Sequence, residues 1–187
     1  MVRIVSNFFH RGPSAAVAAA GLTALQAKAD GGDADAQFGL GLHYGSAGGD
    51  AADFAEAARW YRKAADQDFA LAQYNLGVMF ALGQGVPQDD ASAVGWIRKA
   101  AEGGDAGGQY ELGVRCHRAS VGALRMDPIE SRIEAYKWFH LAEAQGYKDS
   151  VTACQQVTLT MSRGEVDEGN RRAATFVARG ATQAELR

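Results

Sequence analysis

The sequence predicts an all-α protein in which antiparallel helix pairs repeat along the chain, and three observations support this. Ala is abundant, at 37 of 187 residues, and β-branched Ile is rare, at 4 residues, a bias that favours helices over strands. The segment 36–71 returns as 72–107 without a gap. The three prolines, Pro13, Pro87 and Pro128, fall at predicted boundaries and not inside a predicted helix.

The repeat is recognised by two blocks of residues in a fixed register. The block Ala-Gln-x-x-Leu-Gly at 36–41 returns at 72–77, and Trp-x-Arg-Lys-Ala-Ala at 60–65 returns at 96–101. Self-similarity at a period between 20 and 50 residues is typical of stacked repeat architectures. We therefore predict that each copy is one helix–turn–helix unit.

A third copy, 108–149, keeps the register at its start, but its tryptophan arrives late. Six residues are inserted within 117–131. Insertions in repeats map to loops on one face, often a functional face, but a longer loop is also tolerated at little entropic cost. The sequence leaves these two interpretations open.

Partial copies flank the three repeats and complete a single predicted domain, 1–187. Residues 21–35 match the second helix of a repeat and its exit, and residues 150–180 supply capping helices. We expect the last helix to place Ala173, Phe176 and Val177 inside, as the terminal cap of a repeat stack requires.

The first helix of each unit follows from an apolar stripe at helical spacing, Ala36, Leu40 and Tyr44 in the first copy. A glycine recurs inside this helix, although Gly costs roughly 0.5–1 kcal/mol relative to Ala there. We expect these glycines to let the second helix approach closely. They are Gly41, Gly77 and Gly113.

Turn and cap residues predict the remaining boundaries. Gly-rich turns are expected at 48–49 and 83–85, and helix exits at 103–104 and Gly146. Second helices are expected to begin at three aspartates, which are Asp53, Asp89 and Asp127. The carboxylates at 89–90 and 165–168 are interpreted as helix-terminal charges and not as metal ligands.

Taken together, these motifs resemble the Sel1-like repeat, a relative of the tetratricopeptide repeat. The first copy carries AQFGLGLHY (36–44) and AARWYRKAA (57–65), and the second carries AQYNLGVMF (72–80) and AVGWIRKAA (93–101). The resemblance implies a right-handed superhelix, or solenoid, of about eight or nine helices. It also implies an adaptor that holds a partner protein or peptide, as in bacterial signalling and envelope processes.

In such stacks the first helices line the concave side, and the flank away from the second helix forms the candidate partner-binding ladder. Aromatic or basic side chains are favoured at binding hot spots. The alternative is that the aromatic residues of the ladder pack between adjacent first helices. The ladder consists of Phe38, Leu42, Tyr74, Val78, Tyr110, Val114, His117 and Arg118.

Several function classes are disfavoured. A formal net charge of −3 argues against a nucleic-acid partner, and the apolar runs fall short of the roughly 18 residues of a membrane span. No motif for a nucleotide, a metal or a catalytic nucleophile is found, so we predict no catalytic residue, no metal ligand and no cofactor. Cys116 and Cys154 fall at positions of the repeat that are expected to be buried. The two positions differ by nearly one helical turn along the first helix, so we expect no disulfide between them.

The sequence therefore predicts a non-catalytic protein–protein interaction scaffold, monomeric and unable to span a membrane. The alternatives are a hydrolase-type enzyme built on a repeat stack and a structural, self-assembling repeat protein. Residues 1–29 carry basic residues and no acid, which also fits an export signal. Because 21–34 keep the register of the repeat, we expect a retained N-terminus and a cytoplasmic protein, with a periplasmic or exported one as the alternative.

Overall fold

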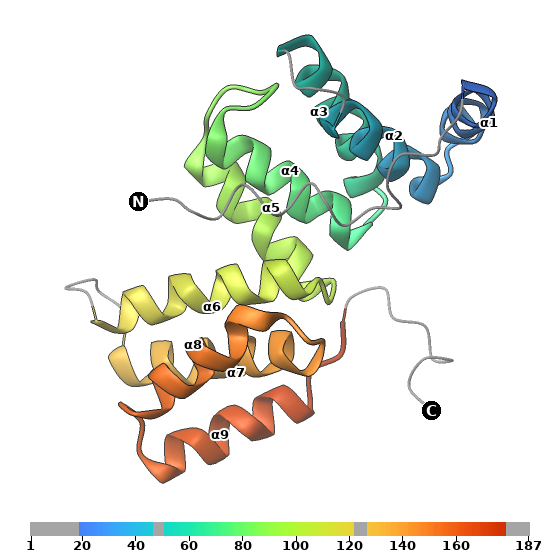
Figure 1. Ribbon diagram of the computed structural model, residues 1–187. Helices are drawn as coiled ribbons and strands as arrows, with labels where there is room; N and C mark the ends of the chain where they lie inside the picture. Colours follow the sequence, from blue (N-terminus) through green and yellow to red (C-terminus); the bar gives the residue numbers. More distant parts are fainter. Residues whose placement is uncertain (1–18, 47–50, 122–126, 179–187) are drawn as a thin grey trace. The chain divides into compact units, whose positions relative to one another are not determined.

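The computed structural model describes residues 19–46, 51–121 and 127–178, and this part of the chain contains nine α-helices and no strand (Figure 1). The all-α class is confirmed. The first helices of the repeats are α2 (Ala34–Ser46), α4 (Ala70–Leu82), α6 (Ala106–Val121) and α8 (Lys148–Thr158). The second helices are α1 (Ala19–Asp30), α3 (Ala51–Ala65), α5 (Asp90–Glu102) and α7 (Pro128–Ala144), and α9 (Arg163–Ala174) closes the array.

The helices form two compact units, residues 1–93 and 94–187, whose boundary falls inside α5. In the first unit α1 packs on α2, α2 on α3 and α3 on α4, and the first helices α2 and α4 also touch. Leu40 and Trp60 are buried in a cluster with Ala29 and Ala36, flanked by Leu22, Leu25 and Tyr44. The predicted N-terminal partial repeat therefore shares a core with the first full repeat.

In the second unit α7 is the central helix, and α6, α8 and α9 all pack on it (Figure 1). Trp138 is buried with Ala101 and Leu112, and its ring meets Phe176 edge-on at 5.4 Å between centroids. A second cluster lies between α7 and α8 and contains Ala135, Tyr136, Phe139, Cys154 and Val157. None of the described helices is long and apolar enough to cross a membrane.

Two of the recurring glycines, Gly41 and Gly113, permit close helix approach, as the sequence predicts. A Cβ added to Gly113 would lie 2.7 Å from the Cδ1 and Cε1 atoms of Phe139, and one added to Gly41 would overlap the Tyr61 ring. Real side chains do not approach this closely, so any larger residue forces the helices apart. Gly169 of α9 faces Tyr136 of α7 in the same way.

A buried glutamine near the start of α2, α4 and α6 ties each of these first helices to the exit of the preceding helix. The Nε2 atoms of Gln37, Gln73 and Gln109 donate to carbonyl oxygens eight residues earlier, at 3.0, 3.1 and 3.4 Å. The acceptors are the carbonyls of Ala29, Ala65 and Ala101, at the end of α1, α3 and α5. Each of these carbonyls also accepts from a backbone amide three residues later, at 3.1 Å, so the glutamine supplies a second hydrogen bond at the helix end.

The predicted turns and caps that can be described are found, except that Asp53 does not begin its helix. Gly83, Gly85, Gly104 and Gly146 all have positive φ angles at helix exits or turns. Asp127 is the N-cap of α7 and accepts from the Ile129 amide at 2.8 Å, and Asp89 accepts from the Ala91 amide at 3.0 Å. Asp53 lies in the first turn of α3, which begins two residues earlier, at Ala51. The predicted turn at 48–49 lies outside the described residues.

The C-terminal cap is held by charge as well as by apolar contact. The Arg172 guanidinium of α9 donates to Glu134 at 2.8 Å and also pairs with Glu130 and Glu168. Arg132 of α7 pairs with Glu165 of α9 at 2.6 Å. Ala173 and Phe176 face inward as expected, but the prediction for Val177 is wrong. The helix ends at Ala174 and Val177 is 56% exposed.

The six-residue insertion is partly helical. Helix α6 has 16 residues, whereas α2 and α4 have 13 each. Residues 119–121, within the segment that holds the insertion, therefore extend the first helix by nearly a turn, and 122–126 lie outside the described residues.

Candidate functional site

Two aromatic residues of the ladder, Phe38 and Tyr110, pack at junctions between successive repeats. Phe38 of α2 lies 5.2 Å from Phe69, the N-cap residue of α4, and Tyr110 of α6 stacks on Tyr147, the N-cap residue of α8, at 5.0 Å. Both keep part of their surface accessible. These two residues therefore pack between successive repeats, as the alternative interpretation expected. The part of their surface that stays accessible can still contact a partner.

Tyr74, the ladder aromatic of the second repeat, is 3% exposed. A side chain buried to this degree offers a partner almost no surface. The remaining aliphatic members of the ladder, Leu42, Val78 and Val114, are half-buried, and Val114 packs against the cluster between α7 and α8.

The basic end of the ladder is on α6, where Arg118 is exposed and His117 is half-buried. The Nδ1 atom of His117 is buried and has no hydrogen-bond partner among the described residues. Burial raises the pKa of nearby Glu111, and the charges of Arg115 and Arg118 act in the opposite direction. Arg118 is thus the ladder residue with the most accessible polar group.

The two thiols differ in their surroundings and are not joined. Cys116 is half-buried between two apolar clusters of the second unit, and Cys154 is 7% exposed. Burial raises the pKa of both thiols, that of Cys154 to about 12. Because the thiolate is the reactive form, neither position has the electropositive setting of a nucleophilic cysteine.

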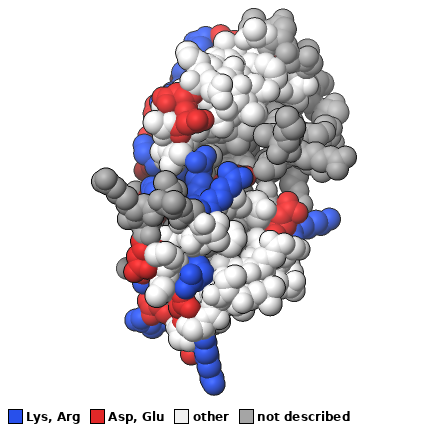
Figure 2. Space-filling view, turned by 90° about the vertical axis from the view of Figure 1, so that its left-hand side faces the viewer, with Lys and Arg blue, Asp and Glu red and all other residues white. Residues whose placement is uncertain are grey.

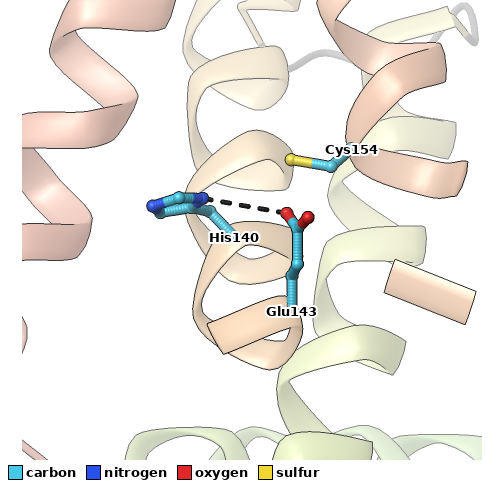
Figure 3. A group of neighbouring side chains, drawn as sticks. All are labelled: His140, Glu143 and Cys154. Atoms are coloured by element: carbon cyan, nitrogen blue, oxygen red, sulfur yellow. Dashed lines mark ion pairs between the residues drawn. The ribbon is translucent and has the colours of Figure 1, made fainter. Parts of the chain in front are cut away.

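One group of potential ligands was missed by the sequence reasoning. His140 and Glu143 of α7 and Cys154 of α8 place one ligand atom each within 4.8 Å of the other two (Figure 3). The His140 Nδ1 atom is 3.9 Å from the Glu143 Oε2 atom. The spacing His-x-x-Glu was visible in the sequence, and it places both side chains on one face of a helix. The contribution of Cys154 depends on how α8 crosses α7, which the sequence does not show.

Charged side chains of both signs share the accessible surface. On the face shown in Figure 2, Lys and Arg lie beside Asp and Glu.

The repeats match the family model of the Sel1 repeat at residues 34–69, 70–105 and 106–147. The chain belongs to the Sel1 repeat family. The third matched repeat has 42 residues and the first has 36, a difference of six. This difference agrees with the six-residue insertion that the sequence shows. The matched repeats begin two residues before the predicted ones.

Two solved structures show the same fold. The antigen c5321 of uropathogenic Escherichia coli strains, which displays an SLR fold, superposes with a TM-score of 0.67 at 27% identity over 83% of this chain. A Sel1 repeat protein from Oxalobacter formigenes superposes with a TM-score of 0.59 at 35% identity over 72% of this chain and 97% of its own. This chain covers 32% of the length of the antigen. No protein of curated function matches it.

These comparisons confirm the predicted solenoid fold class of the Sel1-like repeats. Proteins of Sel1 repeats are generally protein-interaction scaffolds. Both structural neighbours are bacterial proteins.

Proposed function

We propose that this Sel1 repeat protein is a non-catalytic, monomeric scaffold that binds a peptide or a partner protein on the face of its first helices, in bacterial signalling or envelope-related regulation. The observation that carries the proposal is the side-by-side contact of first helices, α2 with α4 and α6 with α8. In each unit this contact gives a shared face on which half-buried apolar residues are presented.

The binding residues within this face are best sought among the accessible members of the ladder. Leu42 and Val78 are half-buried on α2 and α4, and Arg118 is exposed on α6. Arginine is among the residue types that are enriched at binding hot spots. Tyr74 contributes through packing, because its side chain is buried.

The test compares charge insertions on the two kinds of helix. Leu42→Glu and Val78→Glu place a carboxylate on the proposed face, and Ile129→Glu is the control, since Ile129 is 51% exposed on the second helix α7. Affinity capture from the source cells with mass spectrometry should identify a partner of the parent chain. The proposal predicts that this partner is lost with both first-helix variants and kept with the control, with circular dichroism unchanged in all three.

Retention of the same partner by Leu42→Glu and Val78→Glu would contradict the proposed face. Light scattering on the purified chain distinguishes the self-assembling alternative, which requires a symmetric oligomer in the absence of any partner.

We also propose that α1 is retained and that the protein is cytoplasmic. Cleavage after Ala29 would remove Leu22 and Leu25 from the core of the first unit, together with the carbonyl to which Gln37 donates. Intact mass of the protein isolated from its cells tests this. Loss of residues 1–29 would favour the exported alternative.

A further inference from the structure

We propose that His140, Glu143 and Cys154 form a binding site for a divalent transition-metal cation of the Zn²⁺ class, bridging α7 and α8. The three side chains come from two helices that pack on each other, and their ligand atoms converge on one point (Figure 3). The set consists of an imidazole nitrogen, a carboxylate oxygen and a sulfur. These are the three ligand types that zinc sites use in proteins.

The distances are close to those a bound ion requires. Metal–ligand bonds of about 2.0–2.3 Å in a tetrahedral site place ligand atoms about 3.5 Å apart. The present separations are at most 4.8 Å, and the pair Nδ1 to Oε2 is at 3.9 Å. An adjustment of roughly 1 Å closes the site, and the carboxylate of Glu143 has the rotatable bonds to supply it.

The imidazole is held in place by its neighbours. The rings of His140 and Tyr136 are parallel, with an angle of 7° between them and 5.8 Å between centroids. Tyr136 is buried, and its hydroxyl donates to the Oδ1 atom of Asn170 at 3.0 Å.

One side of the site is buried and the other is exposed to solvent, so an ion can reach the site from solvent. Cys154 belongs to the buried cluster with Ala135, Phe139 and Val157. The side chains of His140 and Glu143 are 46% and 37% exposed. An ion can therefore enter from solvent on the side of α7, and three protein ligands leave the fourth position to water.

The charge balance of the group also favours a cation. Among the described residues, His140 is the one basic side chain within ion-pair distance of Glu143, and at 3.9 Å the contact is long. On binding, the Cys154 thiol releases its proton to solvent and its sulfur bonds to the metal, which then faces two anionic ligands. Thiolate with imidazole selects borderline metals over Mg²⁺ or Ca²⁺.

The experiment titrates the purified, metal-free full chain with Co²⁺ as a spectroscopic substitute for Zn²⁺. The proposal predicts one equivalent of Co²⁺ with a thiolate-to-cobalt charge-transfer band, displaced by Zn²⁺ and unaffected by excess Mg²⁺. Cys154→Ser should abolish the charge-transfer band, and His140→Gln and Glu143→Gln should each weaken affinity by at least about tenfold. The matched control is Cys116→Ser, which removes the other thiol and should bind Co²⁺ like the parent chain.

Three results would overturn the proposal. They are the absence of a charge-transfer band in the parent chain, an unchanged band in Cys154→Ser, and loss of the band in Cys116→Ser. If Cys154→Ser does not fold because Cys154 is buried, the variants of His140 and Glu143, which are partly exposed, decide whether the metal site exists. Parent-like affinity in both His140→Gln and Glu143→Gln would refute the site.

Discussion

Replacing Gly113 by Ala should destabilise the second unit, although Ala is the better helix former. The added Cβ would lie 2.7 Å from two carbon atoms of Phe139, whose ring is buried and cannot move outward. Overpacking of this kind costs about 1–3 kcal/mol, and the gain in helix propensity returns about 0.5–1 kcal/mol. The net loss should be up to about 2.5 kcal/mol, since the cost of overpacking is larger than the gain in helix propensity.

Gly95→Ala is the matched control within the same unit. Gly95 is an exposed residue of α5, and among the described residues no heavy atom beyond the nearby helix backbone lies within 4 Å of the Cβ position. This variant should gain the propensity term alone and be more stable than the parent by about 0.5–1 kcal/mol. The difference between the two variants therefore isolates the cost of overpacking, about 1–3 kcal/mol.

Urea unfolding followed by circular dichroism measures both variants. A difference of 1 kcal/mol corresponds to about 2–4 °C in the melting temperature of a chain of this size. The reasoning would be refuted if Gly113→Ala stabilised the protein as much as Gly95→Ala. A double mutant with Phe139→Leu should recover part of the loss, because the smaller side chain makes room for the new methyl group.

Three further perturbations test other parts of the structure. Gln37→Leu removes one of the two hydrogen bonds to the Ala29 carbonyl, which keeps the bond from the Gly32 amide, and this should cost about 0.5–1.5 kcal/mol and speed amide hydrogen exchange in α1. In the folded state, burial raises the pKa of the Asp105 carboxyl group to about 6. The protonated carboxyl group therefore favours the folded state below about pH 4, which is its pKa in the unfolded chain. This contribution to stability is lost as the pH rises through 6. Asp105→Asn should therefore exceed the parent in stability by up to about 2–3 kcal/mol at pH 7 and by little at pH 4, as urea unfolding at the two pH values would show. Arg172→Ala removes the cation shared by three carboxylates, Glu134 among them, and should lower stability by about 1–2 kcal/mol and expose α9 to limited proteolysis.

Local features of the fold could be predicted because their causes lie within a few residues. The cap at Asp127 and the exit at Gly146 depend on the side chain or the φ angle of one residue. The end of the last helix was less predictable. Ala173 is buried as expected, whereas Val177 lies beyond the helix end and is exposed.

Features that join distant segments could not be predicted in the same way. The sequence shows Gln37 and Gln73 in register but not their acceptors, which lie at the end of the preceding helix. The sequence likewise shows that Tyr74 stands at a recurring position of the repeat. It does not show that the side chain is only 3% exposed, because burial depends on every neighbour in space. The metal-ligand group was missed for the same reason, since Cys154 reaches it from another helix.

The use of aromatic rings in packing constrains where recognition can occur. Tyr61 and Phe139 lie over glycines of the first helices, and Phe38 and Tyr110 fill the junctions to the next repeat. A ring that fixes the spacing of helices cannot be exchanged to suit a new partner without a cost in stability. Under the proposed scaffold function, a partner should therefore be selected mainly by accessible residues that do not fix the spacing of helices, such as Arg118 at the basic end of the ladder, and substitutions there should alter binding while the fold stays intact.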